Sequence, residues 1–384
     1  MKARVIAYYL PQFHPIPEND AVWGPGFTEW TNVAKARPKF RGHYQPRIPA
    51  DLGFYDLRLP ETRELQAALA REAGIEGFCY WHYWFGGGRR LLERPFNEVL
   101  ESGKPDFPFC LCWANHDWTT KTWTKGSSRS DKTMIAEQTY PGEADYRAHF
   151  DFCLRAFKDH RYITVDGKPL FAIFDPYKFA DVQQFMALWR QWAQEEGLAG
   201  IHFVALCNST STLRRNAEGK MERVIPNLQS SAEVYADFFH LGFDAVQSFG
   251  KRRAELICEG KYLNIIRKAV TKVLPFLPAP KIDYPKAVKH FFAPEDVQEN
   301  VYPSLLPQWD RTPRANNDEG IYVNATPDTF RRHVEDAVSL VATKEPEHRL
   351  LFLRSWNEWG EGNYVEPDTK YGHGWLDAIA AAVK

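Results

Sequence analysis

The sequence predicts an α/β chain folded as a (β/α)8 TIM barrel with long βα loops, on the basis of three observations. Eight short apolar runs of strand length are spread over all 384 residues. Most of them are separated by segments long enough for a helix. Polar and aromatic residues gather where the runs end. Strand and helix alternating eight times are typical of a closed parallel barrel, whose strand ends meet on one face.

The predicted strands are the apolar runs themselves. In chain order they are Val5–Leu10, Gly77–Trp81, Phe107–Trp113, Leu170–Phe174, His202–Cys207, Ala245–Phe249, Ser304–Trp309 and Leu350–Trp356. Four of the intervening segments have helical patterns, namely Pro60–Ala73, Tyr146–Phe157, Val182–Glu196 and Thr326–Thr343. Acidic Glu61 and Glu64 in the first turn of one helix, and Pro327 and Asp328 at the start of another, favour helix N-termini there.

An open, doubly wound sheet is the competing fold. It is disfavoured because no GxGxxG fingerprint follows the first strand. The run Gly86–Gly88 lacks a following Lys-Ser/Thr, so we interpret it as a flexible turn. The sequence therefore predicts one barrel domain over residues 1–384, with an inserted basic helical segment at about 251–300.

Composition limits the function. The net charge of −1 gives no global attraction to nucleic acid, and the 15% aromatic content suits carbohydrate binding. The six cysteines are expected to be reduced thiols, and Cys110 and Cys112 lack the further Cys/His pair of a zinc site, so no cofactor is expected. The strand that begins after Met1–Arg4 leaves no room for a secretory signal, and no stretch has membrane-spanning length; a cytoplasmic protein is expected.

Aromatic, amide, histidine and acidic side chains close the predicted strands or lie in the loop after the first. Aromatic faces cover the apolar faces of a sugar, and the polar groups bond its hydroxyls. Each one alone is more often structural, so their convergence carries the argument for a glycan site. The candidate substrate-binding residues are Tyr9, Gln12, His14, Trp23, Glu29, Trp30, Tyr80, Trp81, His82, Trp113, Asn115, His116, Trp118, Asp175, Asn208, Trp309, Trp356, Asn357 and Trp359.

The segment Ser355–Pro367 holds two candidate catalytic carboxylates, Glu358 and Glu361, among tryptophans and glycines. Splitting a glycosidic bond takes one carboxyl to protonate the leaving oxygen and a second to supply negative charge or accept a proton. Carboxylates three residues apart on a tight segment reach one side of a sugar ring more readily than both sides. Glu366, before Pro367, is expected to be structural.

Three motifs resemble the WbsX group of glycoside hydrolase family 99-like proteins: Tyr8–His14, Trp23–Val33 and Trp356–Gly362. The resemblance runs from the first predicted strand to the last. It implies a (β/α)8 barrel that acts on α-mannoside-type linkages with retention and without a metal. It also implies a link to lipopolysaccharide O-antigen and other surface-polysaccharide gene clusters.

The related endo-α-1,2-mannosidases supply the roles that the resemblance implies. A Glu corresponding to Glu358 takes the proton of the sugar's 2-hydroxyl and yields a 1,2-anhydro sugar. A Glu corresponding to Glu361 protonates the leaving group and later activates water. We expect a raised pKa for Glu361 from burial against Trp356 or Trp359. Those enzymes carry His where this chain has Gly360, so a different substrate is expected.

The segment 251–290 carries ten Lys/Arg against three acids, a balance of +7. Apolar residues recur in it at helical spacing: Tyr262, Ile265, Ile266, Ala269, Val270 and Val273. Such a basic amphipathic helix suits an anionic membrane surface, which would place the protein peripherally at the inner membrane. The alternative is a stripe that packs on the barrel and turns its lysines to water.

Three functions follow from these patterns. The first is a retaining glycoside hydrolase acting on an oligosaccharide or polysaccharide. The second is a glycosyltransferase of lipopolysaccharide or O-antigen biosynthesis, although neither a DxD motif nor a Rossmann-like phosphate loop is present. Arg or Lys side chains at the barrel mouth could serve a lipid-phosphate donor. The third is a non-catalytic glycan-binding barrel.

Overall fold

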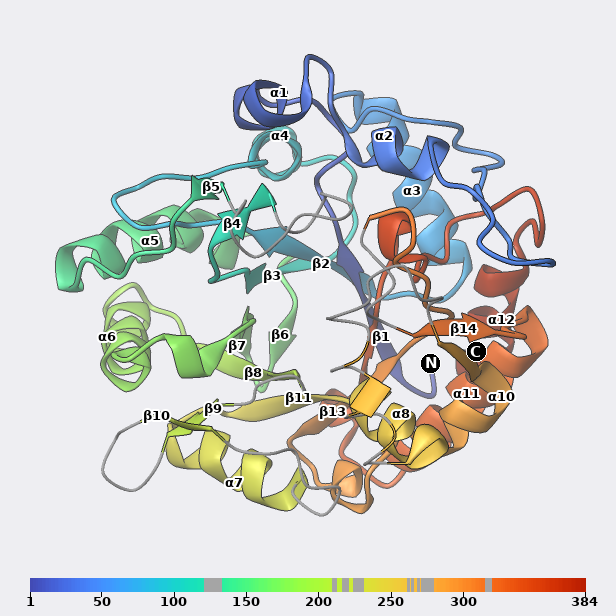
Figure 1. Cartoon of the computed structure of the whole chain (residues 1–384). Coiled ribbons are helices and arrows are strands. Elements are labelled where there is room, and N and C mark those ends of the chain that lie inside the picture. Colours follow the sequence, from blue (N-terminus) through green and yellow to red (C-terminus); the bar gives the residue numbers. More distant parts are fainter. Residues whose placement is uncertain are drawn as a thin grey trace.

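The computed structural model describes residues 1–120, 133–208, 213–215, 221–223, 231–260, 263, 266, 267, 270, 280–314 and 320–384. Eight parallel strands form a closed ring in the order β1, β2, β3, β7, β8, β11, β13 and β15, and β15 pairs back with β1. Helices surround the ring (Figure 1). The predicted (β/α)8 barrel is confirmed.

Each predicted apolar run overlaps one barrel strand. The strands are β1 (Arg4–Tyr9), β2 (Gly77–His82), β3 (Phe109–Trp113), β7 (Lys168–Ile173), β8 (His202–Asn208), β11 (Ala245–Phe249), β13 (Val301–Leu305) and β15 (Leu350–Leu353). The predicted run Ser304–Trp309 was placed too late. Strand β13 begins at Val301 and includes Pro303, and the chain leaves the sheet after Leu305.

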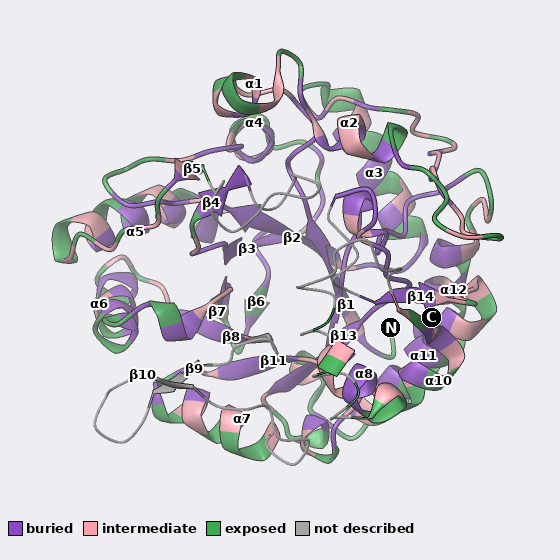
Figure 2. Cartoon of the chain, viewed as in Figure 1, coloured by how far each residue is buried: buried purple, intermediate pink, exposed green. Residues whose placement is uncertain are grey.

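Eight helices of nine residues or more are seen in the described ranges. They are α3 (Pro60–Glu72), α4 (Arg94–Ser102), α5 (Glu143–Phe157), α6 (Val182–Glu195), α7 (Ser231–His240), α8 (Lys251–Glu259), α11 (Pro327–Val341) and α12 (Gly374–Val383). The four predicted helices match α3, α5, α6 and α11 to within a few residues. These helices bury the side that faces the ring and expose the other (Figure 2).

Short elements lie in the connections. The loop after β1 holds α1 (Pro17–Trp23) and α2 (Glu29–Ala34), and α10 (Tyr284–Ala287) follows α8. Small pairs of strands are β4 (Trp118–Thr119) with β5 (Met134–Ala136), β9 (Leu213–Arg215) with β10 (Met221–Arg223), and β12 (Lys281–Asp283) with β14 (Ile321–Val323), while β6 (Thr164–Val165) pairs with β7.

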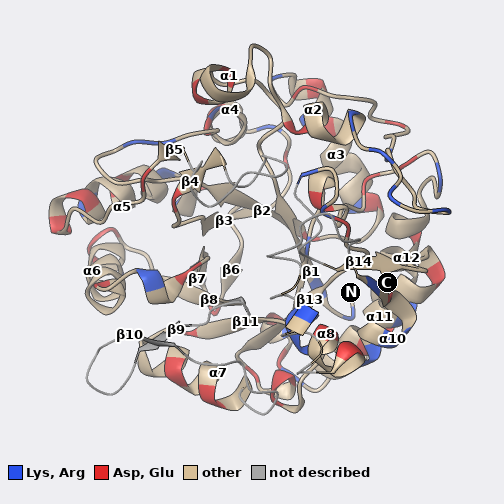
Figure 3. Ribbon diagram, viewed as in Figure 1, with Lys and Arg blue, Asp and Glu red and all other residues tan. Residues whose placement is uncertain are grey.

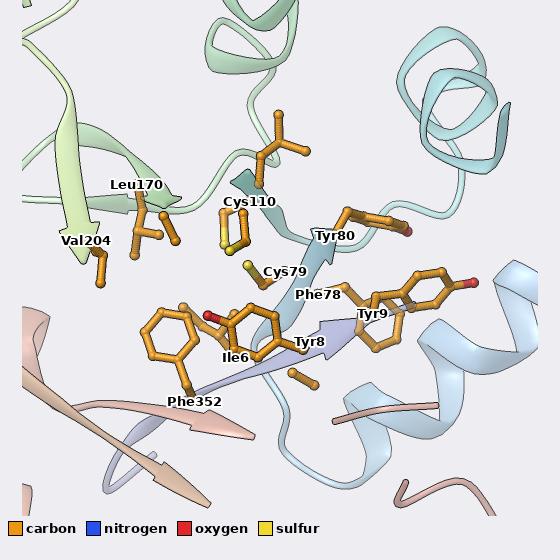
Figure 4. Packing of buried hydrophobic residues seen from close by; sticks show 14 of the residues in the cluster. Ile6, Tyr8, Tyr9, Phe78, Cys79, Tyr80, Cys110, Leu170, Val204 and Phe352 are labelled. Atoms are coloured by element: carbon orange, nitrogen blue, oxygen red, sulfur yellow. The ribbon is translucent and has the colours of Figure 1, made fainter. Parts of the chain in front are cut away.

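Alternate residues of each barrel strand face opposite sides. Ile6 and Tyr8 of β1 point into the ring with Cys79 and Phe352, whereas Tyr9 points toward the surrounding helices (Figure 4). Because a parallel barrel is apolar on both faces of its strands, both sets are buried. Half of the residues at the strand ends therefore face the helix layer and not the barrel interior.

The insertion between β11 and β13 shares a small apolar core with the loop after β13. Its members come from α8, β12, α10 and the loop after β13: Ala254, Ile282, Tyr284, Ala287, Phe291, Leu306, Trp309 and Tyr322. Of the predicted amphipathic stripe, Tyr262, Ile265, Ala269 and Val273 lie outside the described residues. Ile266 and Val270 are described and exposed.

The cysteines are unpaired, as predicted. Cys79, Cys110, Cys112 and Cys153 are buried, and Cys258 is exposed. In the part of the chain that the structure describes, no helix has both the length and the apolar composition needed to cross a bilayer.

Glu366 joins three parts of the fold from a fully buried position. Tyr55 Oη and Trp359 Nε1 donate to its Oε2 at 2.9 and 2.6 Å, and Gln66 Nε2 of α3 donates to its Oε1 at 2.6 Å. Burial raises its pKa to about 7, against the lowering effect of these donors. The predicted structural role fits these contacts.

Replacing Glu366 by Gln should lower the free energy of unfolding and flatten its pH dependence. The amide puts an NH2 group against a buried donor, which costs about 1–3 kcal/mol. Because the folded protein keeps this proton from pH 4.5 to about 7 and the unfolded chain releases it, wild-type stability falls as the pH rises through that window. This one group contributes up to about 1.4 kcal/mol per pH unit.

Urea unfolding across that pH window checks this prediction, with the exposed Glu64→Gln variant as the matched control. The slope of stability against pH should be shallower in Glu366→Gln than in wild type or the control. An identical slope in all three proteins contradicts it.

Candidate active site

The segment after β15 is fixed to the end of β1. Asn357 Oδ1 accepts from the Leu10 N–H at 2.8 Å, and its Nδ2 donates to the Leu10 carbonyl at 3.0 Å. Ser355 Oγ accepts from the Glu358 N–H at 2.8 Å. A 3-10 turn over Trp359–Glu361 then follows. These bonds hold Glu358 and Glu361 at the carboxyl ends of the strands, where barrel enzymes place their sites.

One guanidinium connects both glutamates. Arg314, from the loop after β13, donates through Nη1 to Glu358 Oε1 at 2.9 Å and to Glu361 Oε1 at 2.8 Å. Since both bonds start at one nitrogen, the two oxygens lie less than about 6 Å apart, compatible with the roughly 5 to 5.5 Å of classical retaining enzymes. The Asp310 N–H also donates to the Glu361 carbonyl at 2.8 Å, so the two loops are joined.

A third carboxylate, Glu29, belongs to the same cluster. It is the first residue of α2 and has no exposed surface. Arg314 Nη2 lies 3.1 Å from each of its carboxylate oxygens. Arg311 Nε lies 3.1 Å from Glu361 Oε1 at the more open side. Three acids from two distant parts of the chain therefore share Arg314.

Burial sets the protonation of this cluster. It raises the pKa of Glu29 to about 7, against the opposing effect of Arg314 and with a further increase from the other two glutamates. Burial and the charge of Glu361 raise the pKa of Glu358, while Arg314 and Arg354 lower it. Glu29 therefore keeps its proton up to about neutral pH, and Glu358 keeps its proton to a higher pH than an ordinary glutamate.

The Glu29 carboxylate occupies the space that a side chain at Gly360 would need. A Cβ placed on Gly360 would lie 1.8 Å from Glu29 Oε1 and 2.9 Å from its carboxyl carbon. The space beside Gly360 is therefore taken by a carboxylate and is not free for substrate.

Several predicted residues lie near the carboxylates or on the same face of the barrel. Trp81 points into the ring and stacks on Tyr8 with 4.6 Å between ring centroids. Trp118 stacks on Tyr83, whose pKa is raised first by burial and then by Glu358. His116 packs against Phe174 after β7, and Asp175 pairs with Lys178 at 3.0 Å.

Four predicted residues face the helix layer instead, which corrects the expectation that they line the site. Tyr9 donates to Gln66 at 2.6 Å, Tyr80 packs on Phe96, His82 bonds His149 of α5, and Trp113 donates to the Trp84 carbonyl. Each is one residue out of phase with an inward-facing neighbour on the same strand. Strand alternation therefore separates them from the mouth.

The tryptophans of the terminal motif are buried and support the segment Ser355–Pro367 from inside the fold. Trp356 and Trp359 have no exposed surface. The ring centroid of Trp359 lies 3.6 Å from that of Tyr364, on which it stacks, and 5.4 Å from that of Trp30. Their rings are thus unavailable for stacking on a sugar in this arrangement, contrary to the prediction. The Glu361 side chain keeps 13% exposure.

The remaining predicted residues hold loops in place. The backbone carbonyl of Gln12 accepts from the Glu29 N–H, and Asn115 Nδ2 donates to the Asp175 carbonyl. His14 Nδ1 bonds to the Pro11 carbonyl. Trp23 stacks on Phe27, and Trp309 belongs to the core of the insertion with Lys251 over its ring. The side chain of Asn208 lies outside the described residues.

One cluster has metal-ligand chemistry among the described residues: His82, His149 and Cys153. The two Nε2 atoms are 2.8 Å apart, and His149 stacks on Trp84 with 4.6 Å between centroids. Burial lowers the pKa of His82 to about 3, with Arg90 adding to the effect. We interpret this neutral hydrogen-bonded pair as part of the packing between β2 and α5.

Sequence patterns missed the cations of the site. Arg314 and Arg311 lie in a loop without periodicity, and their partners are separated from them by up to 285 residues. Arg354 offered the clearest signal, since it is the one charged residue inside the predicted strand Leu350–Trp356.

The closed ring and the acids at its carboxyl end define a (β/α)8 barrel with its candidate site at the mouth. The chain belongs to the family described as Glycosyltransferase WbsX, whose model matches residues 5–379. Two curated relatives, each named Uncharacterized protein WxcX, come from Xanthomonas campestris pv. campestris strains ATCC 33913 and B100. Each is 33% identical over 387 residues, and the match covers all of this chain and 50% of the relative. The chain thus spans about half their length.

Solved structures share the fold. The GH99 endo-alpha-mannosidase from Bacteroides thetaiotaomicron superposes with a TM-score of 0.53 at 15% identity, over 99% of this chain and 96% of that one. A protein titled Glycoside hydrolase-like protein gives a TM-score of 0.56 at 15% identity, over 100% and 94% of the two chains. At this identity the likeness establishes the architecture alone.

A double-mutant cycle tests the contact between Gly360 and Glu29. Gly360→Ala should destabilise the protein by about 1–3 kcal/mol, because the added methyl displaces a buried carboxylate from Arg314. In a Glu29→Ala background the space is open, so the same change should cost less than about 0.5 kcal/mol. Urea unfolding of the four proteins gives both values. Equal costs in the two backgrounds would show that the groups do not compete for space.

Proposed function

We propose that this protein is a retaining glycoside hydrolase acting on α-mannoside-type linkages of a bacterial surface polysaccharide or lipid-linked glycan. The observation that carries the proposal is the pair Glu358 and Glu361, bridged by Arg314 at the barrel mouth. Two acids with oxygens less than about 6 Å apart meet the minimum requirement for glycoside cleavage. The shared fold with a GH99 endo-alpha-mannosidase supports this choice of reaction class.

Glu358 acts as the base for the sugar's 2-hydroxyl. It takes that proton while the 2-oxygen bonds to the anomeric carbon and the glycosidic bond breaks. Its raised pKa makes it a stronger base than an ordinary carboxylate. The product of this step is a 1,2-anhydro sugar.

Glu361 is the acid and base at the other oxygen. It gives its proton to the leaving oxygen in the first step. It then takes a proton from the water that attacks the anomeric carbon, while Glu358 returns its proton to the 2-oxygen. Two inversions give net retention. The greater exposure of Glu361, whose side chain has Arg311 beside it, suits a group that meets both a leaving group and water.

Glycosyl transfer to an acceptor is the alternative reaction at the same site. The family description Glycosyltransferase WbsX favours it. An acceptor hydroxyl would then replace water in the second step, with Glu361 as its base. A barrel that binds a glycan without turnover is the third outcome of the test below.

Changing either acid to its amide should abolish turnover. Glu358→Gln and Glu361→Gln should each lose about 10²–10⁴-fold in rate on a competent substrate, because an amide neither accepts nor donates the required proton. The substrates are α-mannosides, rhamnans and mannan oligosaccharides, and NMR follows the anomeric configuration of the first product. Glu101→Gln, at an exposed position on α4, is the control.

Retained configuration with both variants inactive agrees with the proposal. Full activity in both variants removes the assignment of these residues. A new glycosidic product in place of a free sugar identifies transfer, and binding without product identifies a non-catalytic barrel.

We also propose that segment 251–290 contacts an anionic membrane surface. Its described residues Leu263, Ile266 and Val270 are exposed at positions that share one helix face. Lys and Arg gather about α8 and α10 (Figure 3), within the segment whose charge balance is +7. Exposed apolar residues beside positive charge match the chemistry of an interfacial helix.

Liposome flotation checks the membrane proposal. Wild type should float with vesicles containing anionic lipid and stay in solution with neutral vesicles, because binding needs charge and apolar insertion together. A Leu263→Ser, Ile266→Ser, Val270→Ser variant and a Lys/Arg-to-Ser version of the segment should each reduce recovery. Equal recovery of all three proteins on anionic vesicles ends the proposal.

A further inference from the structure

Arg354, directly after β15, is a buried cation that has no hydrogen-bond or ion-pair partner among the described residues, although its charge lowers the pKa of Glu358. Only 9% of the residue is exposed. Its guanidinium makes no hydrogen bond or ion pair with any residue in the described ranges, and its Nε is fully enclosed. Burying a charged group unpaired is costly, so charges inside proteins almost always have partners.

Other buried arginines of this fold follow that rule. Arg161, 3% exposed, bonds both oxygens of Asp159 and the carbonyls of Pro105 and Val99. Arg314 is shared by three carboxylates. Arg354 thus stands out against the way the same chain satisfies its other buried cations.

Three aromatic rings lie against the guanidinium of Arg354. Its guanidinium carbon lies 4.6 Å from the ring centroid of Phe249, 5.7 Å from Tyr8 and 5.9 Å from Trp81. These residues are the last inward-facing side chains of β11, β1 and β2. The rings hold the cation by cation–π attraction, and no described residue accepts a hydrogen bond from the guanidinium.

This arrangement lies beside the catalytic segment. Arg354 is four residues before Glu358, on the same strand end. The stacked pair of Tyr8 and Trp81 adjoins it, and Trp81 keeps 9% exposure. A glycan whose scissile bond reaches Glu358 and Glu361 therefore brings a neighbouring group to Arg354.

We propose that Arg354 binds an oxyanion of the glycan substrate, a carboxylate or a phosphate. The planar fork of a guanidinium matches both groups through two parallel hydrogen bonds. The inference rests on the proposed function of the mouth as a glycan site and narrows its substrate class to acidic or phosphate-linked sugars. A uronic acid residue supplies the carboxylate, and a glycosyl phosphate supplies the phosphate.

Calorimetric binding to the full chain tests this. The probes share one sugar: methyl α-mannopyranoside is neutral, methyl α-mannopyranosiduronate carries a carboxylate, and α-mannose 1-phosphate carries a phosphate. Wild type should bind at least one charged probe about tenfold or more tightly than the neutral probe, as expected for a charge-assisted bond. The charged probe that binds more tightly identifies the source of the oxyanion.

Arg354→Met keeps the stem against the rings and removes the charge. It should abolish the preference for the charged probe and leave the affinity for the neutral one within about twofold. Arg354→Lys should restore part of the preference. Lys178→Gln removes an exposed cation near the end of β7 and should retain the full preference, which excludes a general effect of net charge.

Two results overturn the proposal. One is a wild type with no preference for either charged probe. The other is a Met variant that loses affinity for neutral and charged probes by the same factor, as a purely structural role requires. Because binding is measured without turnover, a failure of the hydrolase assignment leaves this test intact. If Arg354 acted only by lowering the pKa of Glu358, the Met variant would change the pH dependence of the affinity equally for neutral and charged probes.

Discussion

The bridge that Arg314 makes to Glu29, Glu358 and Glu361 is the contact on which the candidate site depends. It joins the loop after the first strand, the loop after β13 and the segment after the last strand. Three neighbouring carboxylates, two of them buried, would repel one another without a cation and would favour protonation. With Arg314 among them, the acids stay close together and keep raised pKa values, as in Glu29 and Glu358. Gly360 is required because its missing Cβ leaves room for Glu29.

The fold could be read from the sequence because its signals are local. Apolar runs such as Val5–Leu10 and the capped helix near Pro327 carry their own evidence, and eight repeats define the architecture. The late placement of β13 has a local cause too, since Pro303 interrupted the apolar run.

The inner surface of the site could be read only in part. Parallel strands are apolar on both faces, so their sequence does not show which alternate residues point inward. Tyr80 and Trp81 are adjacent and both aromatic, yet one packs on Phe96 and the other reaches Tyr8. Glu358 and Glu361 were found because they sit in one short motif. Arg314 was missed because it lies in a loop without a pattern and its partners are 44, 47 and 285 positions away in the chain.

The most direct test of the account is the titration of the Glu29 carboxyl carbon by 13C NMR in wild type and in Arg314→Met. The account predicts a midpoint near pH 7 in wild type, where burial outweighs the arginine, and a higher midpoint once the arginine is gone. A midpoint close to the ordinary 4.5 that does not move on substitution would contradict a buried carboxylate cluster held by Arg314.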